Sequence, residues 1–194
     1  MKVIINLGGF MDFKVSEKNQ EFLLKSARQA IVEYMNLSKI AKVETEDDEL
    51  NTERAVFVTL TKNDNLRGCI GNIIPQQKLI DAVCYMAVAA AFDDPRFPEV
   101  TRDELDEIKI EISVLSSLEK AESYKNIIPQ KHGVMIRNSG RSGLFLPQVW
   151  EHFEPGDIEG FMGELCSQKA GLSRDCWKNP KTEIFLFTVF KFHE

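Results

Sequence analysis

The chain has 194 residues, of which 43% are hydrophobic and 28% are charged. These proportions are ordinary for a globular protein, and they exclude wholesale disorder and the fibrous classes. The formal net charge of −6 has the wrong sign for a protein that binds nucleic-acid phosphates through counterion release. Lysine and arginine are scattered without a basic run, so we do not expect a nucleic-acid partner.

The apolar stretches and the cysteines bear on the compartment of the protein. No stretch approaches the roughly 20 apolar residues of a membrane-spanning helix, so no membrane association is expected. The opening Met1–Leu7 is apolar but short and lacks a small-residue cleavage site, which favours a strand or arm over a signal peptide. We therefore expect a cytoplasmic protein that forms one domain over residues 1–194, with an N-terminal arm at about residues 1–15. The cysteines are few and contain no C-x-x-C pair, which predicts free thiols and no disulfide framework: Cys69, Cys84, Cys166 and Cys176.

Helical spacing of apolar residues recurs in several parts of the chain. An amphipathic helix is expected over residues 16–35, with Ser16 as its N-cap. A second helix, over residues 79–88, is apolar on nearly every side and must end before the prolines of Asp93–Pro98. A third is expected to begin at Asp157 and to end at a left-handed Gly171. The acidic stretch at residues 41–52 has few apolar residues and is expected to be a surface excursion.

Strand patterns lie between these helices. We expect one hairpin over residues 55–71 with its turn at 62–65, and a second hairpin at 134–146 with a connection at 139–143. A half-buried strand with one solvent-exposed face is expected at 108–114. A strand covered on both faces is expected at 184–192. Thr101 and Glu104 have the spacing of a capping box. Strands joined mostly by hairpins, with helices between them, predict an α+β fold with an antiparallel or mixed sheet.

The segment Leu66–Gly71 carries the candidate site, because a strand seldom contains two glycines without a reason. Strand alternation sends Arg67 and Cys69 to one face and sends Leu66 and Ile70 into the core. A permanent cation beside a thiol favours the thiolate, which is the form that acts as nucleophile or ligand. The glycines at positions 68 and 71 would allow close approach by a ligand or a neighbouring chain.

A structural interpretation of the same segment stands beside this one. Cys69 is then a small buried apolar residue, Arg67 pairs with a carboxylate, and the glycines accommodate a bulge. A nucleophilic cysteine also needs a base, and nothing in the spacing of the histidines says which of them, if any, approaches Cys69. They match no metal template either, so we predict no metal or cofactor and expect the histidines at the surface: His132, His152 and His193.

Six segments together resemble a known family, and they occur in the order that the family shows. They are residues 27–31, the sequence LRGCIG at 66–71, AFDDPRFP at 91–98, EISVL at 111–115, GLFLPQV at 143–149 and LCSQKAGL at 165–172. LRGCIG resembles the signature of the AMMECR-one family, known in microbes as AmmeMemoRadiSam system protein A. The resemblance covers roughly residues 20–190, which is far more specific than a lone short motif.

The resemblance implies an α+β fold with a larger and a smaller lobe in intimate contact, and a signature strand near the groove between them. It implies no established reaction. Family members occur beside Memo-type proteins and radical-SAM enzymes, which suggests a shared modification pathway. Carried over by position, the residues that the resemblance favours as a site are Arg67, Gly68, Cys69 and Gly71, with Asp94, Arg96 and Gln148 as secondary candidates. In structural terms, Arg96 would bond exposed helix carbonyls, and Gln148 would end an edge strand.

Two hypotheses about function follow. In the first, the protein is an enzyme component in which a Cys69 thiolate acts on a small anionic substrate held by Arg67. In the second, it is a non-catalytic binding or adaptor module, and the glycine-flanked strand forms a docking groove with the loop Asp93–Pro98. The second is favoured because the enzyme hypothesis lacks a base and a metal template.

Overall fold

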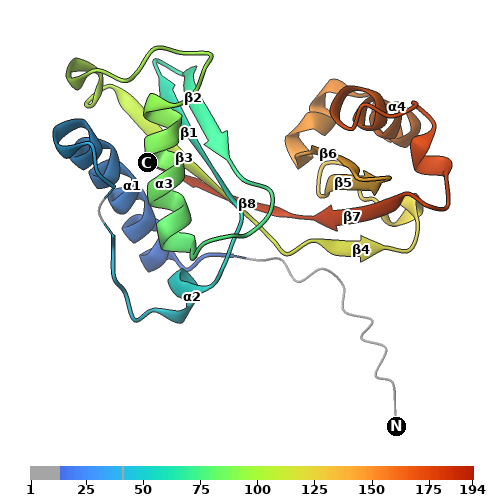
Figure 1. The fold of residues 1–194 in the computed structure, drawn as a ribbon, viewed down its shortest axis with the longest axis horizontal. Coiled ribbons are helices and arrows are strands. Elements are labelled where there is room, and N and C mark those ends of the chain that lie inside the picture. Colours follow the sequence, from blue (N-terminus) through green and yellow to red (C-terminus); the bar gives the residue numbers. More distant parts are fainter. Residues whose placement is uncertain (1–13, 41) are drawn as a thin grey trace, which may run out of the picture.

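The computed structural model describes residues 14–40 and 42–194, so the strand or arm expected at the start of the chain lies almost wholly outside the described residues. The described residues form two lobes, and each is built on a four-stranded antiparallel sheet (Figure 1). The strand orders are β2-β1-β3-β8 and β4-β7-β5-β6. Helices with antiparallel sheets confirm the predicted α+β class. Within the described residues, none of the helices combines the length and the hydropathy that a bilayer-spanning segment needs.

The elements divide between the lobes as follows. The first lobe contains α1 (Glu17–Leu37), α2 (Asp48–Asn51), β1 (Val56–Lys62), β2 (Asn65–Gly71), α3 (Leu79–Phe92), η1 (Arg102–Glu104), β3 (Ile108–Leu115) and β8 (Val189–His193). The second lobe contains β4 (Glu119–Ala121), η2 (Tyr124–Asn126), β5 (Gly133–Asn138), β6 (Arg141–Phe145), η3 (Pro147–His152), α4 (Ile158–Glu164), η4 (Leu165–Lys169), η5 (Cys176–Lys178) and β7 (Glu183–Phe187).

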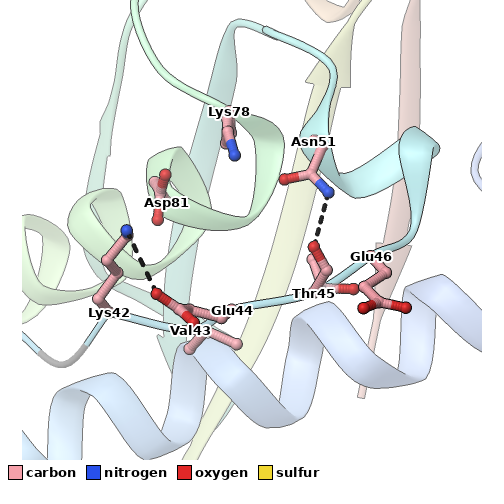
Figure 2. A pocket seen from close by; sticks show the side chains of 8 residues that line it. All are labelled: Lys42, Val43, Glu44, Thr45, Glu46, Asn51, Lys78 and Asp81. Carbon is pink, nitrogen blue, oxygen red and sulfur yellow. Dashed lines mark hydrogen bonds and ion pairs between the residues drawn. The ribbon is translucent and has the colours of Figure 1, made fainter.

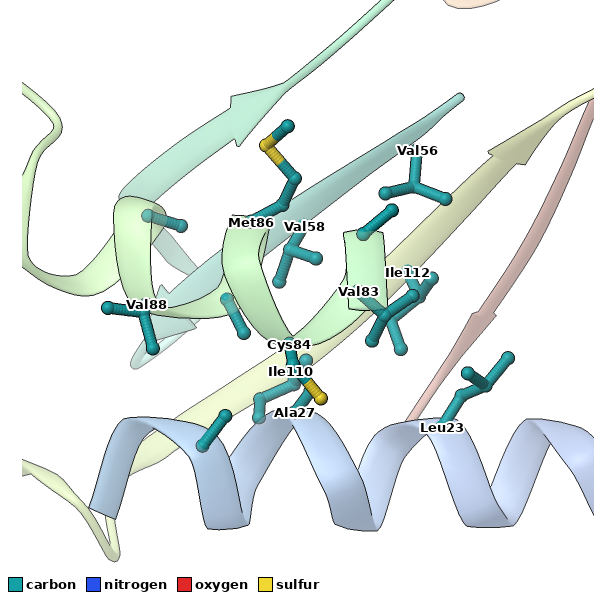
Figure 3. Packing of buried hydrophobic residues seen from close by; sticks show 14 of the residues in the cluster. Leu23, Ala27, Val56, Val58, Val83, Cys84, Met86, Val88, Ile110 and Ile112 are labelled. Atoms are coloured by element: carbon teal, nitrogen blue, oxygen red, sulfur yellow. The ribbon is translucent and has the colours of Figure 1, made fainter. Parts of the chain in front are cut away.

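The core of the first lobe lies between one face of its sheet and the helices α1 and α3 (Figure 3). The predicted alternation of β3 is present, since Ile110 and Ile112 are fully buried against the helices. The other face of β3 is exposed to solvent only in the first half of the strand. In the second half, Ser113 is 4% exposed and Leu115 is 1% exposed. The second lobe covers that end of the sheet, and the sequence pattern did not predict this cover.

The start of α1 is held by a segment that was expected to be a surface excursion. Ser16 is the N-cap residue, as predicted, and its hydroxyl donates to Glu49 Oε2 at 2.9 Å. The same carboxylate oxygen accepts from Asn19 Nδ2 at 2.6 Å. Glu49 lies in α2, whose Leu50 is 2% exposed. Residues 42–52 therefore run largely at the surface, as expected, but they contain a helical turn that packs Leu50 into the core, and the sequence did not predict this turn.

Both predicted hairpins form with two-residue turns. Asn63 and Asp64 have positive φ angles of 51° and 59°, which matches the turn chemistry expected there. In the second hairpin the turn residues are Ser139 and Gly140, with φ of 50° and 78°. This turn is shorter than the expected connection, because residues 141–143 already belong to β6.

The two lobes are joined where the last apolar segment passes from one sheet to the other. The single strand expected at residues 184–192 is interrupted at Thr188, and β7 pairs in the second sheet while β8 pairs in the first. At the crossing the Ser116 amide donates to Thr188 O, and the Thr188 amide donates to Ser116 Oγ, both at 2.9 Å. Side chains of both lobes fill this joint, with Ala55, Leu115 and Phe187 fully buried.

The second lobe has its own aromatic core. The Trp150 ring stacks on Phe161 with the ring centroids 3.6 Å apart, and its indole N–H donates to His132 O at 2.9 Å. His132 is 1% exposed, so its expected surface position is wrong, whereas His152 and His193 are exposed. The third helix begins after Asp157, whose carboxylate accepts from the Gly160 amide at 2.8 Å. A left-handed Gly171 with φ of 62° follows the π-helical turn η4, as predicted for the end of this helix.

A disulfide bond links Cys166 to Cys176, which contradicts the expectation of free thiols at these positions. Cys166 lies in η4 and Cys176 in η5, and the fold brings their Cα atoms to 6.1 Å. This separation suits a disulfide. The pairing could not be predicted from spacing, because it depends on how the chain turns back after Gly171. Cys69 and Cys84 are free.

Candidate functional site

The signature strand β2 contains a β-bulge at Arg67. Leu60 of β1 pairs with Gly68, whereas the next residue, Thr61, pairs with Leu66, so Arg67 is the extra residue. The bulge changes the side-chain alternation that the sequence implied. Leu66 is 44% exposed instead of buried in the core, so this part of the prediction is wrong. Ile70, as expected, packs against the helical core.

Arg67 is committed to the loop that follows α3. Its guanidinium donates to both carboxylate oxygens of Glu104, at 3.0 Å and 2.9 Å, and to Pro98 O at 2.8 Å and Glu99 O at 3.1 Å. The Arg67 residue is 9% exposed. The hydrogen bonds from Arg67 lower the pKa of Glu104 to about 2, against the opposing effect of burial. The guanidinium therefore ties β2 to the 98–104 loop and does not face an open hollow beside the thiol.

The two signature glycines have structural reasons. A β-carbon on Gly68 would lie 2.1 Å from Ala90 O, so this glycine lets the backbone of α3 pack directly on β2. A β-carbon on Gly71 would lie 2.3 Å from Cγ of Phe57, the cross-strand partner of Gly71. The close approach that these glycines permit is by α3 and by Phe57, and not by a bound molecule.

Asp94 and Arg96 hold the backbone of Cys69 at the open edge of the sheet. The Cys69 amide donates to Asp94 Oδ2 at 2.8 Å, and Arg96 Nη2 donates to Cys69 O at 3.1 Å. The two side chains also pair with each other at 2.7 Å. Hydrogen bonds from Arg96 hold the pKa of the Asp94 carboxyl well below its ordinary value. Arg96 thus bonds a strand carbonyl instead of helix carbonyls, and the pair occupies the position of a neighbouring strand.

The Cys69 side chain lies on the sheet face opposite to the helices and is half-buried. Thr59 Oγ1, directly across the strand pair, donates to Cys69 Sγ at 3.2 Å. The same row continues through Glu111 to His193 on β8. Three strand spacings, or about 14 Å, separate His193 from the thiol, which is too far for a nucleophile–base pair. Within residues 14–40 and 42–194, no cluster of three metal-ligating side chains is present.

Gln148 lies in the second lobe and is not brought to Cys69. It belongs to η3 and lines a pocket of about 380 Å³ together with Thr188, Val189 and Lys191. The pocket includes residues of both lobes, so Gln148 lies near the joint. The sequence grouped Gln148 with the signature, but the structure separates it from Cys69 by the width of the first sheet.

A second pocket at the joint contains mostly residues that sequence reasoning did not select. It has a volume of about 480 Å³ and is apolar along most of its lining. Phe57 and Ile73 come from the first lobe, and the other residues come from β6, η3, η4 and the position between β6 and η3. We call it the interlobe pocket, defined by Phe57, Ile73, Leu144, Leu146, Val149 and Lys169. Its sequence signal was the GLFLPQV block at 143–149, whose apolar residues were read as strand only.

A third pocket, of about 450 Å³, lies between residues 42–46 and the start of α3 (Figure 2). Its lining is polar, with Lys42, Lys78 and Asp81 among the charged residues. The Asn51 amide closes one side by donating to Thr45 O at 2.7 Å. No residue of the signature segment or of the Asp94–Arg96 pair lines this pocket among those that the structure describes.

Fold and site together define a two-lobed α+β protein with a clamped signature strand and an apolar pocket at the joint. Residues 24–192 match the family model described as AMMECR1, and the chain belongs to this family, which confirms the resemblance. It is 40% identical to Protein MK0488 of Methanopyrus kandleri, over 95% of this chain and 92% of that protein. It is 39% identical to Protein TK0174 of Thermococcus kodakarensis, over 94% of this chain and 93% of that protein.

A solved structure has the same fold. The crystal structure of the uncharacterized protein PH0010 from Pyrococcus horikoshii superposes with a TM-score of 0.81 and 36% sequence identity, and the match covers 94% of each chain. The names of these relatives state no activity. This agrees with the expectation of an AMMECR-one protein of uncharacterised function.

Proposed function

We propose that this chain is a non-catalytic binding or adaptor component whose protein partner docks at the interlobe pocket. The observation that carries the proposal is the use of the signature residues. The polar groups of these residues are already hydrogen-bonded within the first lobe: Arg67 binds Glu104, and Asp94 and Arg96 bind the backbone of Cys69. What stays open to a partner is the apolar pocket of about 480 Å³, which lies within the range of roughly 300–1,000 Å³ usual for binding pockets.

We further propose that the partners are Memo-type and radical-SAM proteins and that they meet this chain in the cytoplasm. Membership of the AMMECR1 family supports the first part, because family members occur beside such proteins. A disulfide does not exclude a reducing compartment in this case. Cys166 is 0% and Cys176 is 6% exposed, so the surrounding core shields the bond from reductants in solution.

The alternative is an enzyme component with Cys69 as nucleophile and Arg67 as the group that holds a small anionic substrate. The half-exposed thiol is in its favour. Against it stand the commitment of Arg67 to Glu104 and the separation of Cys69 from His193 by three strand spacings. We therefore prefer the adaptor function. Asp94 and Arg96 then serve to hold the edge of β2 through the Cys69 backbone, and Gln148 is retained as a residue near the joint.

Site-specific photo-crosslinking tests the adaptor function. A photoreactive amino acid replaces Leu144, which is partly buried in the pocket wall, and a control chain carries it at Glu21, on the exposed side of α1. We expect a crosslinked protein from position 144 that is absent from position 21. A Memo-type or radical-SAM protein in that adduct supports the proposed partners, and another protein supports docking alone. Equal adducts from both positions, or none from position 144, would refute the proposal.

A further inference from the structure

We infer that the segment entering the interlobe pocket is a peptide with a large apolar side chain and a neighbouring carboxylate, and that this carboxylate pairs with Lys169. The inference rests on the proposed docking function and specifies the partner's chemistry. It follows from the apolar walls, from the positive charge of Lys169 at the rim and from the position of that group.

The walls of the pocket come from the side chains that join the lobes. Phe57, Leu144 and Leu146 are partly buried and pack on the fully buried joint of Ala55, Leu115 and Phe187. A side chain that enters the pocket would therefore extend an existing hydrophobic cluster. Burial of apolar surface there favours the complex, against the costs of association.

The rim continues the apolar surface on the side of the signature strand. Ile73 lines the pocket, and the next residue, Ile74, is 59% exposed. Both lie within three residues of Gly71, after Asn72. An exposed isoleucine that directly follows a pocket residue in the chain offers apolar surface to the residues that flank an inserted side chain.

Charge selects among apolar peptides. The chain as a whole has 30 acidic and 24 basic residues, yet Lys169 is the charged residue of the pocket, and no carboxylate lines it among the residues described. The Lys169 ammonium lies 5.8 Å from the centroid of the Phe145 ring, above the β6 strand. Arg141, at the same junction of β6 and η4, donates to Gly171 O at 2.5 Å and adds a second positive charge. The local field is thus opposite in sign to the net charge, which favours an acidic residue beside the inserted side chain.

Selection from a random peptide library displayed on phage, with the full chain as bait, tests this inference. We expect enriched peptides to combine Leu, Ile or Phe with Asp or Glu one or two residues away. Synthetic copies are then titrated by fluorescence anisotropy against Lys169→Gln, Lys169→Glu and, as matched control, Lys125→Glu on η2, an exposed lysine of the same lobe. Lys169→Gln should weaken binding about fivefold, as for a solvent-exposed ion pair, and Lys169→Glu should weaken it further. Lys125→Glu should change nothing.

Reversal of the charge provides a second readout. A peptide with Lys in place of its acidic residue should bind Lys169→Glu better than the original chain. The inference is overturned if no peptide is enriched, if enriched peptides lack acidic residues, or if the Lys169 variants bind the peptides as tightly as the original chain. It is also overturned if another occupant takes the pocket and excludes the peptides. Such an occupant would be residues 1–13, a second copy of the chain, or a fatty acid, for which decanoate is the probe. If position 144 gives a crosslink but the peptide affinities do not depend on Lys169, the docking function stands and only this inference fails. If position 144 gives no crosslink and the affinities do not depend on Lys169, the docking function and this inference both fail.

Discussion

The ring of Phe57 lies in the space that a β-carbon on Gly71 would fill, with Cγ of the ring 2.3 Å from that position. Gly71 ends the signature strand, and Phe57 forms a wall of the interlobe pocket. The last glycine of LRGCIG therefore fixes the shape of a pocket that the motif itself does not line. This relationship connects the family signature with the joint between the lobes without any chemistry at Cys69.

Gly71→Ala should destabilise the protein by roughly 1–3 kcal/mol, because the new methyl group forces the Phe57 ring to move. The new β-carbon would also lie 2.5 Å from the carbonyl oxygen of Val56, so the backbone of β1 must shift together with the ring. Urea unfolding gives the free energy. Phe57→Ala in the same background should recover part of the loss, since alanine lacks the Cγ and Cδ1 atoms that the methyl group meets. Equal losses for Gly71→Ala with and without Phe57→Ala would contradict the contact.

Gly68→Ala should cost more than Gly71→Ala. The atom that its β-carbon meets at 2.1 Å is the carbonyl oxygen of Ala90 in the last turn of α3, and this helix backbone cannot rotate away as a side chain can. Gly140→Ala is the matched control, because nothing lies within 4 Å of its β-carbon and its φ of +78° is the only difficulty. That control should cost about 1 kcal/mol. If Gly68→Ala unfolds no more easily than Gly140→Ala, α3 does not pack on β2 as described.

Local features of the fold could be predicted from the sequence, and long-range ones could not. Asn63 and Asp64 determine a turn by their own conformational preferences, and Thr101 with Glu104 forms the predicted capping box. The interruption at Thr188 has no such signal, because either sheet could have paired an apolar strand there. It is set by hydrogen bonds to Ser116, 72 residues earlier in the chain.

The candidate site shows the same limit. LRGCIG could be recognised, but the destination of the Arg67 side chain depends on a bulge and on a carboxylate 37 residues away. The alternative that Arg67 pairs with a carboxylate and the glycines accompany a bulge was closer to the structure than the reactive-site hypothesis. Phe57 and Lys169 were missed because neither has a sequence pattern that marks a pocket wall.

Glu104 makes stability depend on pH in acid. Its pKa is about 2 in the folded protein against an ordinary 4.5, so folding favours the ionised form. The resulting stabilisation is complete above about pH 4.5 and is lost as the pH falls toward 2. This stabilisation is on the order of 3 kcal/mol, since each pKa unit corresponds to about 1.4 kcal/mol. It is not strongly screened by solvent, because the Glu104 side chain is largely buried beside Arg67.

Glu104→Gln should therefore flatten the dependence of unfolding free energy on pH between 5 and about 2.5. The protein should also be less stable at neutral pH, since Gln gives Arg67 no charge to pair with. Chemical denaturation across this range measures both effects. Glu21→Gln, on the exposed side of α1, serves as the control and should keep the original slope. Identical slopes for Glu104→Gln and the original chain would show that the ion pair does not govern acid stability.

The free cysteines should differ sharply in reactivity. Burial, with a further contribution from Asp81, raises the pKa of the Cys84 thiol to about 11, so this residue is protonated at neutral pH. Cys69 is half-exposed on the open sheet face. Iodoacetamide at pH 8 should therefore label Cys69 alone in the folded protein, and peptide mass spectrometry identifies the site. Labelling of Cys84 at the rate of Cys69 would contradict the packing of α3. An unlabelled Cys69 would remove the nucleophile of the enzyme alternative.

The disulfide between Cys166 and Cys176 closes a loop with a sequence separation of 10, and it should stabilise the second lobe by roughly 2.5 kcal/mol. Both sulfurs lie in the aromatic core, so reductant alone should leave the folded protein intact. In denaturant, the chain should show two reactive thiols without reductant and four with it. Cys166→Ala with Cys176→Ala should speed amide exchange in β5 and β6 more than in β1 and β3, because the bond constrains only the second core. Four thiols without reductant would show that the bond does not form, and equal changes in both sheets would show that the lobes unfold as one unit.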